Sequence, residues 1–77
     1  NLNWGLYGAC EGGIVPLMEL MIAKGANNWN WGLEGACRGG SLQLAKLMIA
    51  KGVTNIQECA NDVRHNKKMM ELLKQYL

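Results

Sequence analysis

Hydrophobic residues recur along this chain at intervals of three and four, the spacing that places side chains on one face of an α-helix. In the middle of the chain this pattern predicts a short helix with Leu33 on its buried face and Asn30 as its N-cap. Gly39-Gly40 predicts its end, because glycine readily adopts the left-handed conformation of helix C-termini. A second helix then runs from Ser41, its predicted N-cap, to Gly52. Its apolar positions are Leu44, Ala45, Leu47, Met48 and Ile49. No stretch shows the alternation of a β-strand.

The same plan occurs twice, because residues 1–27 and 28–54 are copies of one 27-residue unit. These stretches, repeat 1 and repeat 2, are identical at 17 of 27 aligned positions. The second helix of repeat 1 starts around Pro16, where the missing N–H is tolerated. The apolar positions of repeat 1 are Leu6, Ala9, Cys10, Leu17, Leu20 and Met21. Residues 55–77 keep the outline of a unit but contain no glycine or tryptophan, as expected for a terminal unit facing solvent.

The C-terminal segment also predicts two helices. Thr54 and Gln57 match a capping box at the start of the first helix, and Asn66 can cap the second. The apolar positions are Ile56, Cys59, Ala60, Val63, Met69, Met70, Leu72, Leu73 and Tyr76. The sequence therefore predicts one all-α domain over residues 1–77, a solenoid of stacked helix–turn–helix units with short connections. The units are residues 1–27, 28–54 and 55–77.

The run WGLYGACEGGIVPLMELMIAKGA resembles an ankyrin repeat and aligns with that family's pattern without a gap. The matching positions are Leu6, Ala9-Cys10, Gly13, Leu20-Met21 and Gly25-Ala26, together with their equivalents in repeat 2. Trp-Gly stands where Thr-Pro is usual, and the period is 27 rather than about 33. The missing residues belong to the projecting β-hairpins of ankyrin repeats, so we expect no substantial hairpin fingers. Similar divergent units are familiar from large DNA viruses.

Stacked repeats present an extended surface, which favours a scaffold that binds a protein partner and performs no chemistry. The candidate contact residues are those that differ between matched exposed positions, or that lie in the connection between repeats. They are Tyr7 and Glu34, Glu11 and Arg38, Asn27 and Thr54, and Asn28 and Trp29. Trp29 has no tryptophan counterpart in repeat 1, so it is freer to serve as an interface anchor. Packing against the adjacent unit is the alternative for this side chain.

A second hypothesis is a structural or assembly role. Nothing in the sequence covers the first helical pair, so an apolar end is expected to be exposed there. This would suit a fragment of a longer repeat array, a self-associating chain or a subunit of a larger complex.

The composition indicates which classes of partner and which cellular compartment to expect. The net charge of +2 is small, and Lys67, Lys68 and Lys74 lie late in the chain, so the dense basic stripe of nucleic-acid binders is absent. No apolar run approaches the ~20 residues of a membrane span, and no signal-peptide pattern is visible. Three cysteines are an odd number for a disulfide framework. We therefore expect a reducing, cytoplasmic setting, which is the host cytoplasm if the protein is viral.

Few residues suggest catalytic or metal chemistry. Cys59 and His65 form the nearest Cys/His pair, but their spacing is not that of a zinc site, which needs about four ligands. No third group is placed to orient a Cys/His nucleophile. Cys10 and Cys37 occupy paired-alanine positions and are predicted to be small buried residues. We expect no enzyme activity, metal or cofactor.

Two glycines inside each first helix predict close packing. Gly5 and Gly8 recur as Gly32 and Gly35, although glycine in a helix costs about 1 kcal/mol relative to alanine. We expect a neighbour to approach this face, with the tryptophan of the next unit as a candidate. The recurring Trp4 and Trp31 are predicted to be framework residues. The methionines are expected mainly in the core; they are Met18, Met21, Met48, Met69 and Met70.

Overall fold

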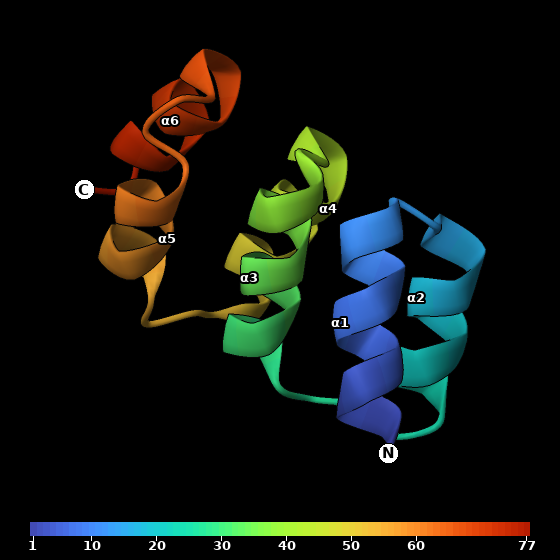
Figure 1. The fold of residues 1–77 in the computed structure, drawn as a ribbon. Helices are drawn as coiled ribbons and strands as arrows, with labels where there is room; N and C mark the ends of the chain where they lie inside the picture. The colour runs from blue at the N-terminus through green and yellow to red at the C-terminus, as the bar shows by residue number, and fades with distance from the viewer.

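The computed structural model describes residues 1–77, which form six α-helices arranged as three pairs (Figure 1). The helices are α1 (Leu2–Gly12), α2 (Val15–Ala23), α3 (Trp29–Gly39), α4 (Leu42–Lys51), α5 (Ile56–Asp62) and α6 (Lys67–Lys74). Each odd-numbered helix packs against the even-numbered helix that follows it, and α3 also packs against both α1 and α5. Helices α1, α3 and α5 therefore form an odd-numbered row, beside an even-numbered row of α2, α4 and α6. The predicted all-α class is confirmed. None of the helices has the length and apolar character needed to cross a membrane.

Asparagine side chains cap the N-termini of three of these helices. The Oδ1 atom of Asn1 accepts hydrogen bonds from the backbone N–H groups of Asn3 and Trp4, at 2.8 and 3.0 Å. Its counterpart Asn28 accepts from Trp31 N–H at 3.1 Å, so the prediction of Asn30 as the N-cap was wrong. Helix α3 begins earlier than expected because Asn28, like Asn1, satisfies an amide of the first turn. The predicted cap by Asn66 on α6 is confirmed.

The predicted capping box at the start of α5 is wrong. Thr54 bonds to Asn30 instead, and the Gln57 side chain donates to Asn61 Oδ1 at 3.2 Å. Asn55 is the N-cap residue of α5, without a side-chain capping bond. Ser41 takes the predicted N-cap position of α4, but its hydroxyl also makes no capping bond.

Glycines end the first helix of each repeat as predicted. Gly13 and Gly40 have φ values of 69° and 74°, in the left-handed region that glycine adopts without strain. The N–H groups of the next residues, Ile14 and Ser41, return to the carbonyls five residues earlier, each at 2.9 Å. The chain therefore reverses within two residues and starts the second helix.

The core runs through all three helical pairs. Its buried side chains are Leu6, Ala9, Cys10, Met18, Ala26, Leu33, Ala36, Cys37, Leu44, Ala45, Met48, Cys59, Ala60, Val63, Met69, Leu72 and Leu73. Burial of Met18, Met48 and Met69 confirms the prediction for those methionines, and Met21 and Met70 pack at the edge of the core.

Four predicted apolar positions are substantially exposed: Leu17, Leu20, Leu47 and Tyr76. The exposed leucines lie on α2 and α4, in the even-numbered row. Helical periodicity shows which side of a helix is apolar, but it does not show how much of that side another helix covers.

The close neighbours of the helical glycines are the second helix of the same repeat and the preceding repeat. A methyl group at Gly32 would come within 2.5 Å of the sulfur of Met48, and Gly5 faces Met21 in the same way. A methyl group at Gly35 would come within 2.5 Å of the carbonyl oxygen of Tyr7. The prediction of a close approach is confirmed at Gly5, Gly32 and Gly35, but the approaching group is methionine or backbone and not tryptophan. The prediction is wrong at Gly8, where a methyl group would meet no atom within 4 Å.

Candidate functional site

Three aromatic side chains gather on the odd-numbered row. Trp4 and Tyr7 lie one turn apart on α1, and their ring centroids are 6.2 Å apart with the rings nearly perpendicular. Trp31 of α3 packs against both, at 4.8 Å from Trp4 and 5.6 Å from Tyr7. These residues form the aromatic cluster. Trp4 remains 60% exposed, so the cluster presents a large indole surface to solvent.

Four of the predicted contact residues lie around this cluster. Tyr7 and Arg38 are joined directly, because the Arg38 guanidinium donates a hydrogen bond to the Tyr7 hydroxyl at 3.2 Å. Glu34 lies between Trp31 and Arg38 on α3 and, with Trp31, lines a hollow of about 510 Å³. Glu11 is exposed one turn beyond Tyr7 on α1. The structure thus brings Tyr7, Glu11, Glu34 and Arg38 to one face.

A second hollow, of about 430 Å³, separates α3 from the turn after α5. Its polar lining consists of Glu11, Arg38, Asp62 and His65. The odd-numbered helices carry the carboxylates of Glu11, Glu34, Glu58 and Asp62 and only one basic side chain, Arg38. The charged residues of the even-numbered helices are two glutamates, Glu19 and Glu71, and five lysines, which all lie on α4 and α6. The aromatic cluster therefore lies on the acidic row of the molecule.

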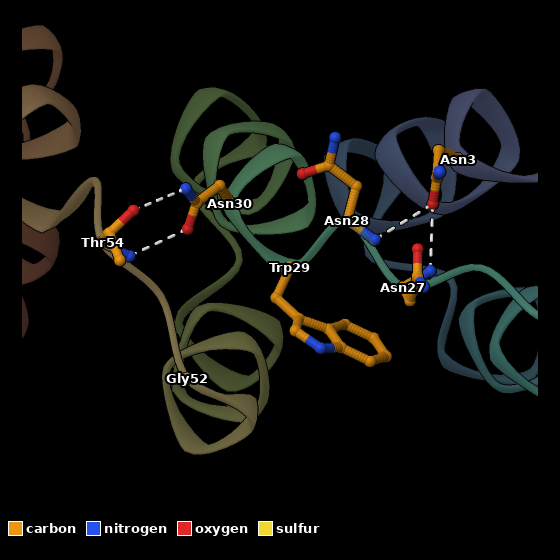
Figure 2. Close-up of a pocket in the computed structure, with 7 residues that line it drawn as sticks. All are labelled: Asn3, Asn27, Asn28, Trp29, Asn30, Gly52 and Thr54. Carbon is orange, nitrogen blue, oxygen red and sulfur yellow. Dashed lines mark hydrogen bonds between the residues drawn. The ribbon is translucent and has the colours of Figure 1, made fainter.

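The other predicted contact residues lie at an adjoining edge, which we call the asparagine edge (Figure 2). It is formed by Asn3, Asn27, Asn28, Trp29, Asn30, Gly52 and Thr54, around an open hollow of about 440 Å³. Asn28 and Asn30 also line the hollow beside Trp31, so this edge is continuous with the surface of the aromatic cluster.

Each repeat uses one asparagine to hold the connection that follows it. The Oδ1 atom of Asn3 accepts from the backbone N–H groups of Asn27 and Asn28, at 3.0 and 3.1 Å. At the matched position, the Oδ1 atom of Asn30 accepts from Thr54 N–H at 2.9 Å, and its amide donates to the Thr54 hydroxyl at 2.8 Å. These bonds satisfy backbone amides in both connections. The predicted contact residues Asn27, Asn28 and Thr54 are thus also tied into the framework.

Trp29 is half-buried at this edge. Its side chain packs against the core, and the ammonium group of Lys51 lies 5.3 Å from its ring centroid. A cation at that distance over an indole face is attracted by the ring electrons. Packing against the core and the contact with Lys51 therefore account for much of this side chain, and the more exposed tryptophan is Trp4.

The cysteines are buried, free thiols. Burial raises the pKa of Cys10 to about 11, and a hydrogen bond with Cys37 together with burial raises the pKa of Cys59. Both are therefore protonated, weakly nucleophilic thiols at neutral pH. No group of three or more His, Cys, Asp or Glu side chains is placed to hold a metal ion.

The prediction that Trp4 and Trp31 are framework residues does not account for the exposed surface of Trp4. The sequence does contain an indication of this surface, because the spacing of Trp4 and Tyr7 places two aromatic rings on one helix face. No family model, curated protein or solved structure matches this chain. The functional conclusion therefore depends on the geometry of the aromatic cluster and the charges around it.

Proposed function

We propose that this chain is a protein-binding module whose odd-numbered row binds a segment of a partner rich in lysine or arginine. The observation that carries the proposal is the indole of Trp4, which is 60% exposed and yet held against Trp31 and Tyr7. Tryptophan, tyrosine and arginine are the residue types that contribute most of the binding energy at protein interfaces. Arg38, hydrogen-bonded to Tyr7, completes that set.

The packing of the aromatic cluster favours binding because it holds Trp4 in place before a partner arrives. A side chain that is already ordered loses less conformational entropy on association. Its exposed face offers apolar area and a surface that attracts cations, since a basic group over an indole is stabilised by the ring electrons.

The charges around the cluster favour a basic partner. Glu34 lies beside Trp31, and Glu11 and Asp62 line the neighbouring hollow. A surface with an excess of carboxylates attracts a cationic segment, increases its association rate and disfavours an acidic one. Five of the eight lysine and arginine side chains lie on the even-numbered helices, whereas Arg38 is the one basic side chain on the odd-numbered helices.

We also propose that the three helical pairs form a short ankyrin-like stack. This is supported by the 27-residue repeat and by the packing of α3 against both α1 and α5. The three free, buried cysteines are compatible with a reducing compartment such as the cytoplasm.

Selection from a displayed library of random peptides tests the binding function directly, because such a library offers basic, acidic and apolar segments together. We expect recovered peptides to be enriched in lysine and arginine, and their binding to weaken as salt increases. Trp4→Ala should abolish most of the binding, whereas Tyr76→Ala, which removes an exposed aromatic ring in the turn after α6, should leave it unchanged. Recovery of acidic or purely apolar peptides, or equal binding by both variants, would reject the proposal.

A further inference from the structure

The contact between repeat 1 and repeat 2 depends on glycine. A methyl group at Gly35 of α3 would come within 2.5 Å of the Tyr7 carbonyl oxygen, and one at Gly39 would overlap the Glu11 carbonyl. The two glycines therefore let α3 approach the backbone of α1 more closely than any other residue would allow.

The same glycines stand in repeat 1, where no other helical pair approaches them. Gly8 and Gly12 are the counterparts of Gly35 and Gly39. A methyl group at Gly8 would meet no atom within 4 Å, and one at Gly12 would meet only the side chain of Ile14 in the adjoining turn. Gly8 lies in the interior of α1, where glycine lowers helix stability without any packing benefit in this chain.

Apolar residues show the same difference independently of the glycines. Leu17 and Leu44 are matched leucines, yet Leu44 is fully buried and Leu17 is 37% exposed. Met48 is fully buried and lines the hollow between α2 and α4, whereas its counterpart Met21 is only partly buried. Repeat 1 thus keeps the residues that repeat 2 buries, on a side that no other helical pair covers. We call this side, formed by Gly8, Gly12, Leu17 and Met21, the open side of repeat 1.

We infer that the open side of repeat 1 is a docking surface for one more helical pair of the same 27-residue type. The contact between α1 and α3 indicates which element would occupy the open side. We call the side of α1 that carries the Tyr7 and Glu11 carbonyls its carbonyl edge. Gly35 and Gly39 allow this edge to pack closely against α3. The matched Gly8 and Gly12 leave the same space for the carbonyl edge of another such helix.

A second copy of this chain does not offer that edge. The α1 edge is covered by α3, through Tyr7 and Glu11, and α3 in turn packs against α5. The remaining end of the chain, α5 and α6, differs from an α1-type unit because it exposes the polar side chains of Gln57, Glu58 and Asn61. The fitting occupant is therefore an additional unit of the repeat whose carbonyl edge is free.

Placing a duplicate of residues 1–27 before Asn1 tests this inference. The new junction joins Asn27 to Asn1 and reproduces the natural junction, because Asn1 and Asn28 are both N-cap asparagines. We expect the extended chain to unfold in one urea transition, with a higher midpoint and a steeper dependence on urea than the original chain.

Gly8→Ala supplies the discriminating variant. In the original chain the added methyl group enters open space in a helix, so the urea midpoint should rise. In the extended chain the same residue of the internal unit would meet the added helix, so the midpoint should fall. The inference is rejected if the shift is upward in both chains, or if the duplicate unfolds separately or adds no helix by circular dichroism. A dimer of the original chain that Gly8→Arg disrupts would also reject it, since the occupant would then be a second copy.

Discussion

The indole of Trp4 packs on that of Trp31, its counterpart one repeat along the chain, with ring centroids 4.8 Å apart and planes tilted by 55°. This contact joins the two best-matched parts of the sequence through identical residues. Trp31 is half-buried beneath it, whereas Trp4 is mostly exposed. One aromatic position thus supports the packing of the repeats and also forms the candidate interaction surface.

The contact between these rings should be measurable as a coupling energy. Trp31→Ala is expected to destabilise the fold more than Trp4→Ala, because Trp31 contacts both Trp4 and Tyr7 and is less exposed. A double-mutant cycle in urea should give a coupling of about 0.5–1.5 kcal/mol. Strictly additive effects of the two variants would show that the rings do not interact in solution.

The matched leucines Leu44 and Leu17 should differ strongly in their contribution to stability. Leu44→Ala removes a fully buried side chain and should cost about 2–5 kcal/mol. This is comparable with the whole stability expected of a small domain, so the variant should be largely unfolded. Leu17→Ala removes a partly exposed side chain and should cost clearly less. Similar urea midpoints for the two variants would contradict the described packing of α2 and α4.

The Asn30 side chain should stabilise the connection after α4 through two separate hydrogen bonds. Asn30→Ala removes the acceptor for Thr54 N–H and the donor to the Thr54 hydroxyl, and should cost about 1–2 kcal/mol. Asn30→Asp keeps the acceptor for Thr54 N–H, and its second carboxylate oxygen can accept from the Thr54 hydroxyl in place of the lost donor, so its midpoint should lie clearly above that of the alanine variant. Faster amide hydrogen exchange at Thr54 in the alanine variant alone would show that the loss of stability comes from the missing acceptor for this N–H group.

The buried Cys10 thiol should make stability fall at high pH. Burial raises its pKa from the ordinary value of 9.0 to about 11 in the folded chain. The unfolded chain therefore releases this proton first, so the stabilisation is complete below pH 9 and is lost as pH rises from 9 to about 11. Cys10→Ala should flatten this part of the profile relative to the wild type. Parallel profiles for the two proteins across this pH range would exclude the thiol as the cause.

Helix positions were predictable because the repeat supplies strong local signals. The glycine pairs ending α1 and α3 and the cap by Asn66 follow from backbone rules that hold without tertiary structure. The caps at Asn30 and Thr54 were predicted wrongly for a tertiary reason. These two side chains bond to each other across 24 residues, and that long-range pairing leaves no local trace in the sequence.

The candidate surface was only partly predictable. Variation between repeats selected Tyr7 and Arg38, which the structure joins by a hydrogen bond. It could not select Trp4, because an identical counterpart suggested a framework role. Exposure of a residue in a stack depends on which neighbours are present, and identical residues in repeats 1 and 2 have different neighbours.

The most direct test of the proposed binding surface is a titration followed by the indole N–H signals of the three tryptophans in an NMR spectrum. A lysine- or arginine-rich peptide from the library selection would be added to the isotopically labelled protein, with signals assigned from single Trp→Phe variants. We predict that the signals of Trp4 and Trp31 shift with increasing peptide while that of Trp29, packed beneath Lys51, stays in place. Shifts confined to Trp29 would place the binding surface at the asparagine edge and contradict the account.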